Sequence, residues 1–155
     1  MPIVFARVDD RLIHGQVVQA WLPELNIDEV LISRPKGEAG ALSEGLLRLS
    51  LPYEYELSIL DAPAAMRHAA ASKRRIFLLL GSLDAFTDLI KEGLQIKSVN
   101  IGGMHFKDNA QKLAEHVFLD KHDKQLLKLV HDLGIAIETR AVPNDVSISV
   151  NEVIS

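Results

Sequence analysis

The sequence contains no cysteine and no long hydrophobic run, and each absence excludes classes of protein. Without cysteine, the 155-residue chain forms no disulfide, thiolate zinc site, iron–sulfur cluster or cysteine nucleophile. Its apolar stretches, such as residues 76–80, are far shorter than the roughly 20 residues needed to span a bilayer. The first residues lack the basic and apolar regions of a signal peptide. We therefore expect a soluble, cytoplasmic protein.

Positive charge is also in short supply. Seventeen Lys and Arg residues stand against 21 Asp and Glu residues, which gives a formal net charge of -4. No general basic field exists to attract nucleic acid, so any anion site must be local. The hydrophobic share of 48% and the charged share of 25% are typical of globular proteins. A chain of this length fits one core, so we expect residues 1–155 to form a single domain.

Short apolar runs rich in β-forming residues alternate with longer helical patterns. This alternation predicts an α/β fold with a single open, mostly parallel central sheet and helices on both faces. The run 76–80 is apolar on both faces, which indicates the central strand. Pro23 is expected to end or bend the first helix. Strands are expected at 3–8, 30–32, 55–60, 76–80, 97–101, 117–119, 135–139 and 146–150, and helices at 16–22, 41–51, 62–71, 82–91 and 120–133.

The loop after the first expected strand is the densest in chemically reactive side chains. Ligands of open α/β sheets bind at the carboxyl ends of strands, where this loop lies. Backbone N–H groups from Gly15 onward would point at an anion, and Gly15 lets the backbone approach closely. Arg7 and Arg11 offer planar guanidinium groups that match phosphate oxygens. His14 has a ring nitrogen that can attack phosphorus near neutral pH.

Two readings of this loop stay open from the residues alone. In the first, Asp9 or Asp10 holds one nitrogen of His14 and fixes its tautomer, so that the loop performs phosphoryl transfer by positioning and charge stabilisation. In the second, the aspartates and arginines form a helix cap with a surface ion pair, and His14 is structural.

The other histidines are expected to be structural. His68 lies in an alanine-rich helix and is expected at the surface. No histidine spacing matches a metal motif and no nucleotide-binding glycine motif occurs, so we expect neither a metal nor a cofactor. Asn100 and His105 flank the pair Gly102 and Gly103, which we expect to end a strand in a turn that needs positive φ.

Three segments carry a family resemblance. Residues 7–18 read RVDDRLIHGQVV and closely resemble the active-site segment of the IIB subunits of the mannose/fructose/sorbose family of the bacterial phosphotransferase system. Residues 99–106, VNIGGMHF, are similar to the Asn-x-Gly-Gly segment of that family, and residues 142–145, VPND, are similar to its C-terminal motif. The resemblance spans nearly the whole chain.

The resemblance implies a phosphocarrier without a cofactor. The expected donor is a phosphorylated IIA protein, and the expected acceptor is a sugar held by the membrane proteins IIC and IID, with which this protein would associate peripherally. His14 would carry the phosphoryl group, and Arg11 and Asp10 match the family's arginine and aspartate in the same loop. The expected phosphate-binding residues are Arg7, Gly15, Gln16, Val17 and Ser82.

Residues 33–37 depart from the family pattern. The sequence SRPKG stands where the family usually has Asn-Asp and an acidic helix start, so positive charge replaces negative charge near the expected site. This leaves open a regulatory phosphocarrier, or a partner-docking domain, that is not coupled to sugar transport. A phosphatase with a covalent histidine intermediate is a weaker alternative, because Ile13 replaces the arginine that histidine phosphatases have before their histidine. The sugar, the IIA donor and a homo-oligomeric state are also left open.

Overall fold

A six-stranded parallel sheet forms the centre of the protein, in the order β3-β2-β4-β1-β5-β8. The computed structural model describes residues 2–38 and 41–154, apart from the side chain of Glu152. The strands are β1 (Ile3–Asp9), β2 (Glu29–Ser33), β3 (Glu56–Leu60), β4 (Ile76–Leu80), β5 (Ser98–Gly103) and β8 (Ala136–Glu138). The expected α/β class is confirmed, and β4 lies beside β1 at the centre of the sheet, as predicted.

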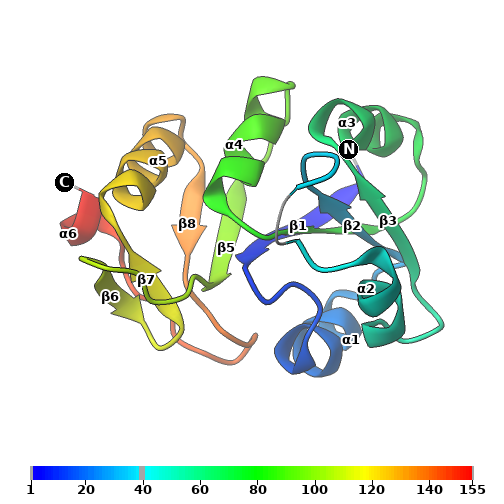
Figure 1. Ribbon diagram of the computed structural model, residues 1–155, viewed down its shortest axis with the longest axis horizontal. Coiled ribbons are helices and arrows are strands. Elements are labelled where there is room, and N and C mark those ends of the chain that lie inside the picture. The colour runs from blue at the N-terminus through cyan, green and yellow to red at the C-terminus, as the bar shows by residue number, and fades with distance from the viewer. Residues whose placement is uncertain (1, 39–40, 155) are drawn as a thin grey trace.

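Helices cover both faces of the sheet (Figure 1). On one face lie α3 (Ala62–Ala71), α4 (Leu83–Lys91) and α5 (Lys121–Asp132), and on the other lie the π-helix η1 (Gln16–Trp21), α1 (Leu22–Leu25) and α2 (Glu44–Ser50). Most helices begin at a side-chain cap, because Ser43, Asp61, Ser82 and Asp120 each accept a backbone N–H from the first turn.

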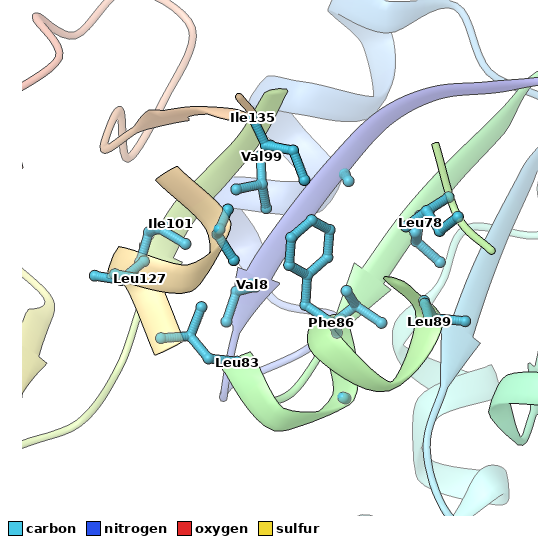
Figure 2. Packing of buried hydrophobic residues seen from close by; sticks show 14 of the residues in the cluster. Val8, Leu78, Leu83, Phe86, Leu89, Val99, Ile101, Leu127 and Ile135 are labelled. Carbon is cyan, nitrogen blue, oxygen red and sulfur yellow. The ribbon is translucent and has the colours of Figure 1, made fainter. Parts of the chain in front are cut away.

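Alternate residues of the central strands fill two separate apolar layers. In β4, Phe77 and Leu79 pack toward η1, α1 and α2, whereas Leu78 and Leu80 pack toward α3, α4 and α5. Figure 2 shows this second layer, where Phe86 and Leu83 of α4 lie against the sheet. Each central strand therefore contributes to both layers.

Two of the expected strands differ from the structure. Residues 117–119 form β7 (Val117–Leu119), which pairs antiparallel with β6 (Gln111–Ala114) in a separate small sheet and not in the main one. The expected strand 146–150 is wrong, because this segment folds back along the end of β8, and α6 (Asn151–Ile154) follows it. The hydroxyl of Thr139 accepts the N–H of Ile148 at 2.7 Å, and the hydroxyl of Ser147 accepts the N–H of Thr139 at 3.1 Å. Side-chain bonds therefore replace a strand ladder here.

Pro23 does not end the first helix as expected. The chain forms η1 and then continues as α1 to Leu25, with Pro23 in the first turn of α1. A proline is tolerated there because a first-turn N–H needs no helical acceptor. The N–H of Leu22 bonds to the carbonyl of Val17, five residues back, which marks the wide π turn before the proline.

The sheet order creates a divergence at the carboxyl ends of β1 and β4. The chain leaves β1 toward η1 on one face and leaves β4 toward α4 on the other. Loops that diverge from neighbouring parallel strands leave a crevice, which is where open α/β sheets bind their ligands. This edge carries the loop from Asp10 to Gly15.

Candidate active site

The loop after β1 folds back over the end of its own strand. The N–H of Leu12 bonds to the carbonyl of Asp9 at 2.9 Å, and Leu12 adopts φ 56°, a left-handed conformation that is rare for leucine. The carbonyl of His14 accepts the N–H of Val18 and so starts the next helix. This tight turn brings the His14 ring back onto the side chain of Asp9.

His14 and Asp9 form the central contact of the site. Nε2 of His14 lies 2.8 Å from Oδ2 of Asp9, and the side chains are 18% and 0% exposed. Burial alone would raise the pKa of Asp9. Hydrogen bonds from His14 and Arg11, together with the charge of Arg7, outweigh that effect and hold the pKa of Asp9 well below its usual range. Asp9 is therefore ionised, and Nε2 of His14 donates to it.

Arg11 forms a second ion pair with Asp9. Its Nε donates to Oδ1 of Asp9 at 3.0 Å, and its Nη2 donates to Oδ2 of Asp9 and to Oε1 of Gln16, both at 3.0 Å. The Arg11 side chain is 35% exposed, so its guanidinium reaches solvent beside His14. Gln16 thus joins the expected site through Arg11.

Arg7 lies beneath Asp9, away from solvent, and not at the surface where the sequence suggested a phosphate contact. Its side chain is fully buried and donates to Asp9 at 2.9 Å, to Oδ1 of Asn100 at 2.8 Å and to the carbonyl of Ala141 at 3.0 Å. Burial lowers the pKa of Arg7, against the opposing effect of Asp9. Arg7 therefore contacts the site from beneath, through Asp9 and through Oε1 of Gln16 at 3.3 Å.

The glycine pair at the end of β5 makes room for these two side chains. A Cβ on Gly102 would lie 2.0 Å from Cζ of Arg7, and one on Gly103 would lie 2.5 Å from Oδ1 of Asp9. Neither glycine has the positive φ that we expected; among the residues that the structure describes, Gly37, Gly93 and Gly134 have one. Steric access, and not turn geometry, requires glycine at these two positions.

Asp10 and Ser82 lie on the other side of the loop. Oδ2 of Asp10 accepts the N–H of His105 at 2.7 Å and lies 2.6 Å from its Nδ1. In the described part of the chain, Asp10 makes no hydrogen bond to His14, so the choice left open between Asp9 and Asp10 falls on Asp9. Ser82 caps α4 and lines a cavity with Asp10 and Leu12.

The amides of Gly15, Gln16 and Val17 precede the first helical hydrogen bond, as the sequence predicts. Gly15 itself is not needed for space, because a Cβ there would meet nothing within 4 Å and its φ is -52°.

Sequence reasoning missed the segment that closes the site from the far end of the chain. The carbonyl of Ala141 accepts from Arg7 and also from Nε1 of Trp21 at 2.8 Å. Nδ2 of Asn100 donates to Glu138 and to the carbonyl of Arg140. All but one of these contacts use backbone carbonyls, which leave no residue signal in a sequence; the exception is the carboxylate of Glu138. The Asn100 side chain was visible as part of the Asn-x-Gly-Gly segment.

Three further observations concern His68, metal ligands and membrane spans. Nε2 of His68 lies 2.8 Å from Oε2 of buried Glu29, so His68 is a partner of a core carboxylate and not a free surface residue. Within residues 2–38 and 41–154, no group of three or more His, Asp or Glu side chains is arranged to hold a metal ion. No helix in that part of the chain is long and apolar enough to cross a bilayer.

Comparisons with known proteins place the chain in a family. Residues 3–155 match the family model described as the sorbose subfamily IIB component of the PTS system. The sorbose-specific EIIB component of Lacticaseibacillus casei is 33% identical over 95% of this chain and 92% of its own length. The mannose-specific EIIAB component of Escherichia coli K12 is 30% identical over the whole chain, which spans 49% of that longer protein.

The solved structures agree with the sequence relatives. The IIBSor domain of the sorbose permease from Klebsiella pneumoniae superimposes with a TM-score of 0.86 at 28% identity, covering 98% of this chain and 95% of that one. The chain belongs to the sorbose-subfamily IIB components of the phosphotransferase system, the phosphotransferases that pass a phosphoryl group from IIA to a sugar.

Proposed function

We propose that His14 carries the phosphoryl group, and that it does so on Nδ1. The observation that carries this proposal is the 2.8 Å contact between Nε2 of His14 and buried Asp9. A nitrogen that donates to a carboxylate holds the ring proton, so the other nitrogen keeps its lone pair for attack. Asp9 therefore acts as the positioning residue that selects the tautomer and fixes the plane of the ring.

The transfer is a displacement at phosphorus. The lone pair of Nδ1 forms the new N–P bond as the bond between phosphorus and the nitrogen of the IIA phosphohistidine breaks, and that nitrogen keeps the bonding electrons. His14 then carries a positive charge with its proton still on Nε2. The ionised Asp9 lies directly against that charge and stabilises it.

The phosphoryl oxygens face positive groups on the open side of the loop. Arg11 is partly exposed next to His14, and the amides of Gly15, Gln16 and Val17 come before the first helical hydrogen bond. Gln16 accepts from Arg7 and Arg11 through Oε1, which leaves its amide hydrogens to donate. Arg7 holds Asp9 from beneath, Asn100 in turn accepts from Arg7, and neither is placed to touch the phosphoryl group.

In this proposal Asp10 positions the loop and does not act on His14 directly. Its carboxylate accepts the N–H of His105 and so ties the loop after β1 to the end of β5. It fixes the path of the loop without contacting His14.

A IIA protein and the membrane components IIC and IID are the partners that the family implies in general. We propose that residues 1–155 act as one domain that takes the phosphoryl group from IIA and delivers it at the membrane to a sugar held by IIC and IID. The EIIAB name of the mannose-specific relative, whose chain is about twice as long, supports a IIA protein as the donor.

Phosphoryl transfer from purified phospho-IIA tests the proposal. The protein should take up an acid-labile label, His14→Ala should take up none, and the matched control His122→Ala should label normally because His122 is exposed and pairs with Asp84. Nuclear magnetic resonance of the phosphorylated protein should place phosphorus on Nδ1. Labelling of His14→Ala, or phosphorus on Nε2, would overturn the assignment.

A further inference from the structure

Arg34 is a half-buried cation that has a buried donor without a partner. It follows β2, and its backbone N–H bonds to the carbonyl of Leu60. Its Nη1 is enclosed and has no hydrogen-bond partner within residues 2–38 and 41–154. An enclosed guanidinium nitrogen without an acceptor is costly, because the group has lost water and gained nothing in return. An anion that binds there would remove this cost.

Arg34 borders a cavity beside the active-site loop. This cavity has a volume of about 160 Å³ and brings together the carboxyl ends of β1, β2 and β4. Its polar side chains are Asp10, Ser33, Arg34, Glu38 and Ser82. A water molecule occupies roughly 30 Å³ of liquid, so the cavity has room for a small solute of several heavy atoms.

This cavity has fewer carboxylates than the cavity of about 260 Å³ that Arg34 also borders. The larger cavity is lined by the carboxylates of Asp61, Asp88 and Glu92 and by one further cation, Lys91. The smaller one has two carboxylates: that of Asp10 is already engaged by His105, and that of Glu38 belongs to an exposed residue. The hydroxyl of Ser82 accepts the N–H of Ala85 and keeps its own hydrogen to donate.

The first turn of α4 adds donors at the same place. Ser82 is the N-cap of this nine-residue helix, and the N–H groups of Leu83 and Asp84 precede the first helical hydrogen bond, which Phe86 makes to Ser82. Backbone amides at a helix start and a guanidinium together form a common phosphate-binding arrangement.

We propose that this cavity binds a phosphate oxyanion, either free or as the phosphoryl end of a small phosphate ester, with Arg34 as its anchor and Ser82 as a second donor. The site is distinct from His14, which does not line the cavity. It shares the active-site loop through Asp10 and Leu12, so an occupied cavity would hold one side of that loop in place. The proposal does not depend on which residue is phosphorylated.

Titration of the ¹⁵N-labelled full chain, followed by amide chemical shifts, tests the site. The probes are inorganic phosphate and glycerol 3-phosphate, with glycerol as the uncharged control. We expect both anions to shift the amides of Ser82, Leu83 and Asp84, and glycerol to shift none. Tighter binding of the ester than of phosphate would identify esters as the ligand, and equal binding would identify the free anion; either outcome supports an oxyanion site.

Two substitutions at Arg34 and one at Arg11 separate this site from the catalytic loop. Arg34→Gln should weaken the affinity for both anions roughly tenfold or more, because a charge-assisted hydrogen bond is lost. Arg34→Lys should weaken this affinity less. Arg11→Gln should leave anion binding at this cavity unchanged. The spectra of the free variants show whether each is folded. Shifts that survive Arg34→Gln, or that occur at Gly15 to Val17 and vanish in Arg11→Gln, would overturn the proposal.

Discussion

Asp9 is the residue on which the side chains of the active site converge. Its two oxygens accept from Arg7, Arg11 and His14 while the carboxylate itself is fully buried. Three donors offset the cost of burying one charge, and the pKa of Asp9 falls below its usual range as a result. Asp9 links the buried Arg7 to the partly buried His14, so a substitution of Asp9 should affect both residues.

Replacing Asp9 by asparagine should slow phosphorylation of His14 by roughly 100-fold or more, because the ring loses the carboxylate that fixes its tautomer and stabilises its positive charge. The same change leaves Arg7 buried without its ion-pair partner, so the free energy of unfolding should fall by about 3–5 kcal/mol. Initial rates of transfer from phospho-IIA, measured where the variant is folded, and denaturant unfolding check the two effects.

The neighbouring aspartate supplies the control for this prediction. Asp10→Asn removes a partly exposed carboxylate whose partner is the exposed His105, so its rate should change less than about tenfold. If Asp10→Asn proved as slow as Asp9→Asn, the tautomer role assigned to Asp9 would be wrong.

The sequence indicated a candidate loop for the chemistry but not which carboxylate faces His14. Asp9 and Asp10 are adjacent and identical in type, and the choice depends on how the loop turns. The turn depends on Leu12 at φ 56°, a conformation that a leucine does not signal. Arg7 lies deeper than the sequence indicated. Its chemistry suggested a phosphate contact, whereas its position inside β1 buries it.

At the scale of elements, β5 contributes to the site because two of its residues, Gly102 and Gly103, have no side chain. Gly102 and Gly103 lie in the strand beside β1, and the guanidinium of Arg7 and the carboxylate of Asp9 fill the space that side chains would occupy. The pair of strands works as one unit, in which β1 supplies the charged side chains and β5 supplies the space and the Asn100 amide.

Gly102→Ala should therefore disturb the site from a neighbouring strand. A Cβ 2.0 Å from Cζ of Arg7 forces the buried guanidinium to move, which should cost about 1–3 kcal/mol of stability and slow phosphorylation of His14. Gly15→Ala is the matched control, since its Cβ meets nothing and its backbone amide is kept; its stability should change by no more than about 1 kcal/mol. Equal effects from the two changes would contradict this account of β5.

Element prediction succeeded where the hydrophobic pattern is strong and local. The apolar run of β4 and the alanine-rich α3 have the predicted bounds. The sequence shows that β4 is apolar on both faces, and the structure adds the Asp61 cap at the start of α3. The segment 146–150 has an equally strand-like pattern, but Val146 is 87% exposed and the chain there is held by Thr139 and Ser147. A pattern of residue types does not show which backbone groups have found another partner.

At the scale of the whole molecule, the sheet joins two apolar layers through shared strands. Leu78 packs in the layer of α3, α4 and α5, and Phe77 beside it packs in the layer of η1, α1 and α2 with Trp21. The strand order β3-β2-β4-β1-β5-β8 could not be derived from the sequence, because it depends on pairings between segments far apart along the chain. That order makes each layer depend on the other.

Removal of one core side chain should therefore be detected on the opposite face. Leu78→Ala should lower the free energy of unfolding by about 2–5 kcal/mol, since Leu78 is 1% exposed in a packed layer. Trp21, the sole tryptophan, lies in the other layer. If residues 1–155 unfold as one unit, tryptophan fluorescence and far-ultraviolet circular dichroism should shift to the same lower denaturant midpoint with an unchanged slope.

The exposed Leu49 provides a control of the same chemistry on the surface of α2. Leu49 is 85% exposed, so Leu49→Ala should change the free energy of unfolding by no more than about 0.5 kcal/mol. A Leu78→Ala transition in which circular dichroism moves and tryptophan fluorescence does not would divide the chain into two units. Coincident transitions would instead mean that the buried network around Arg7 and Asp9, which lies at the centre of the sheet, is as stable as the whole fold.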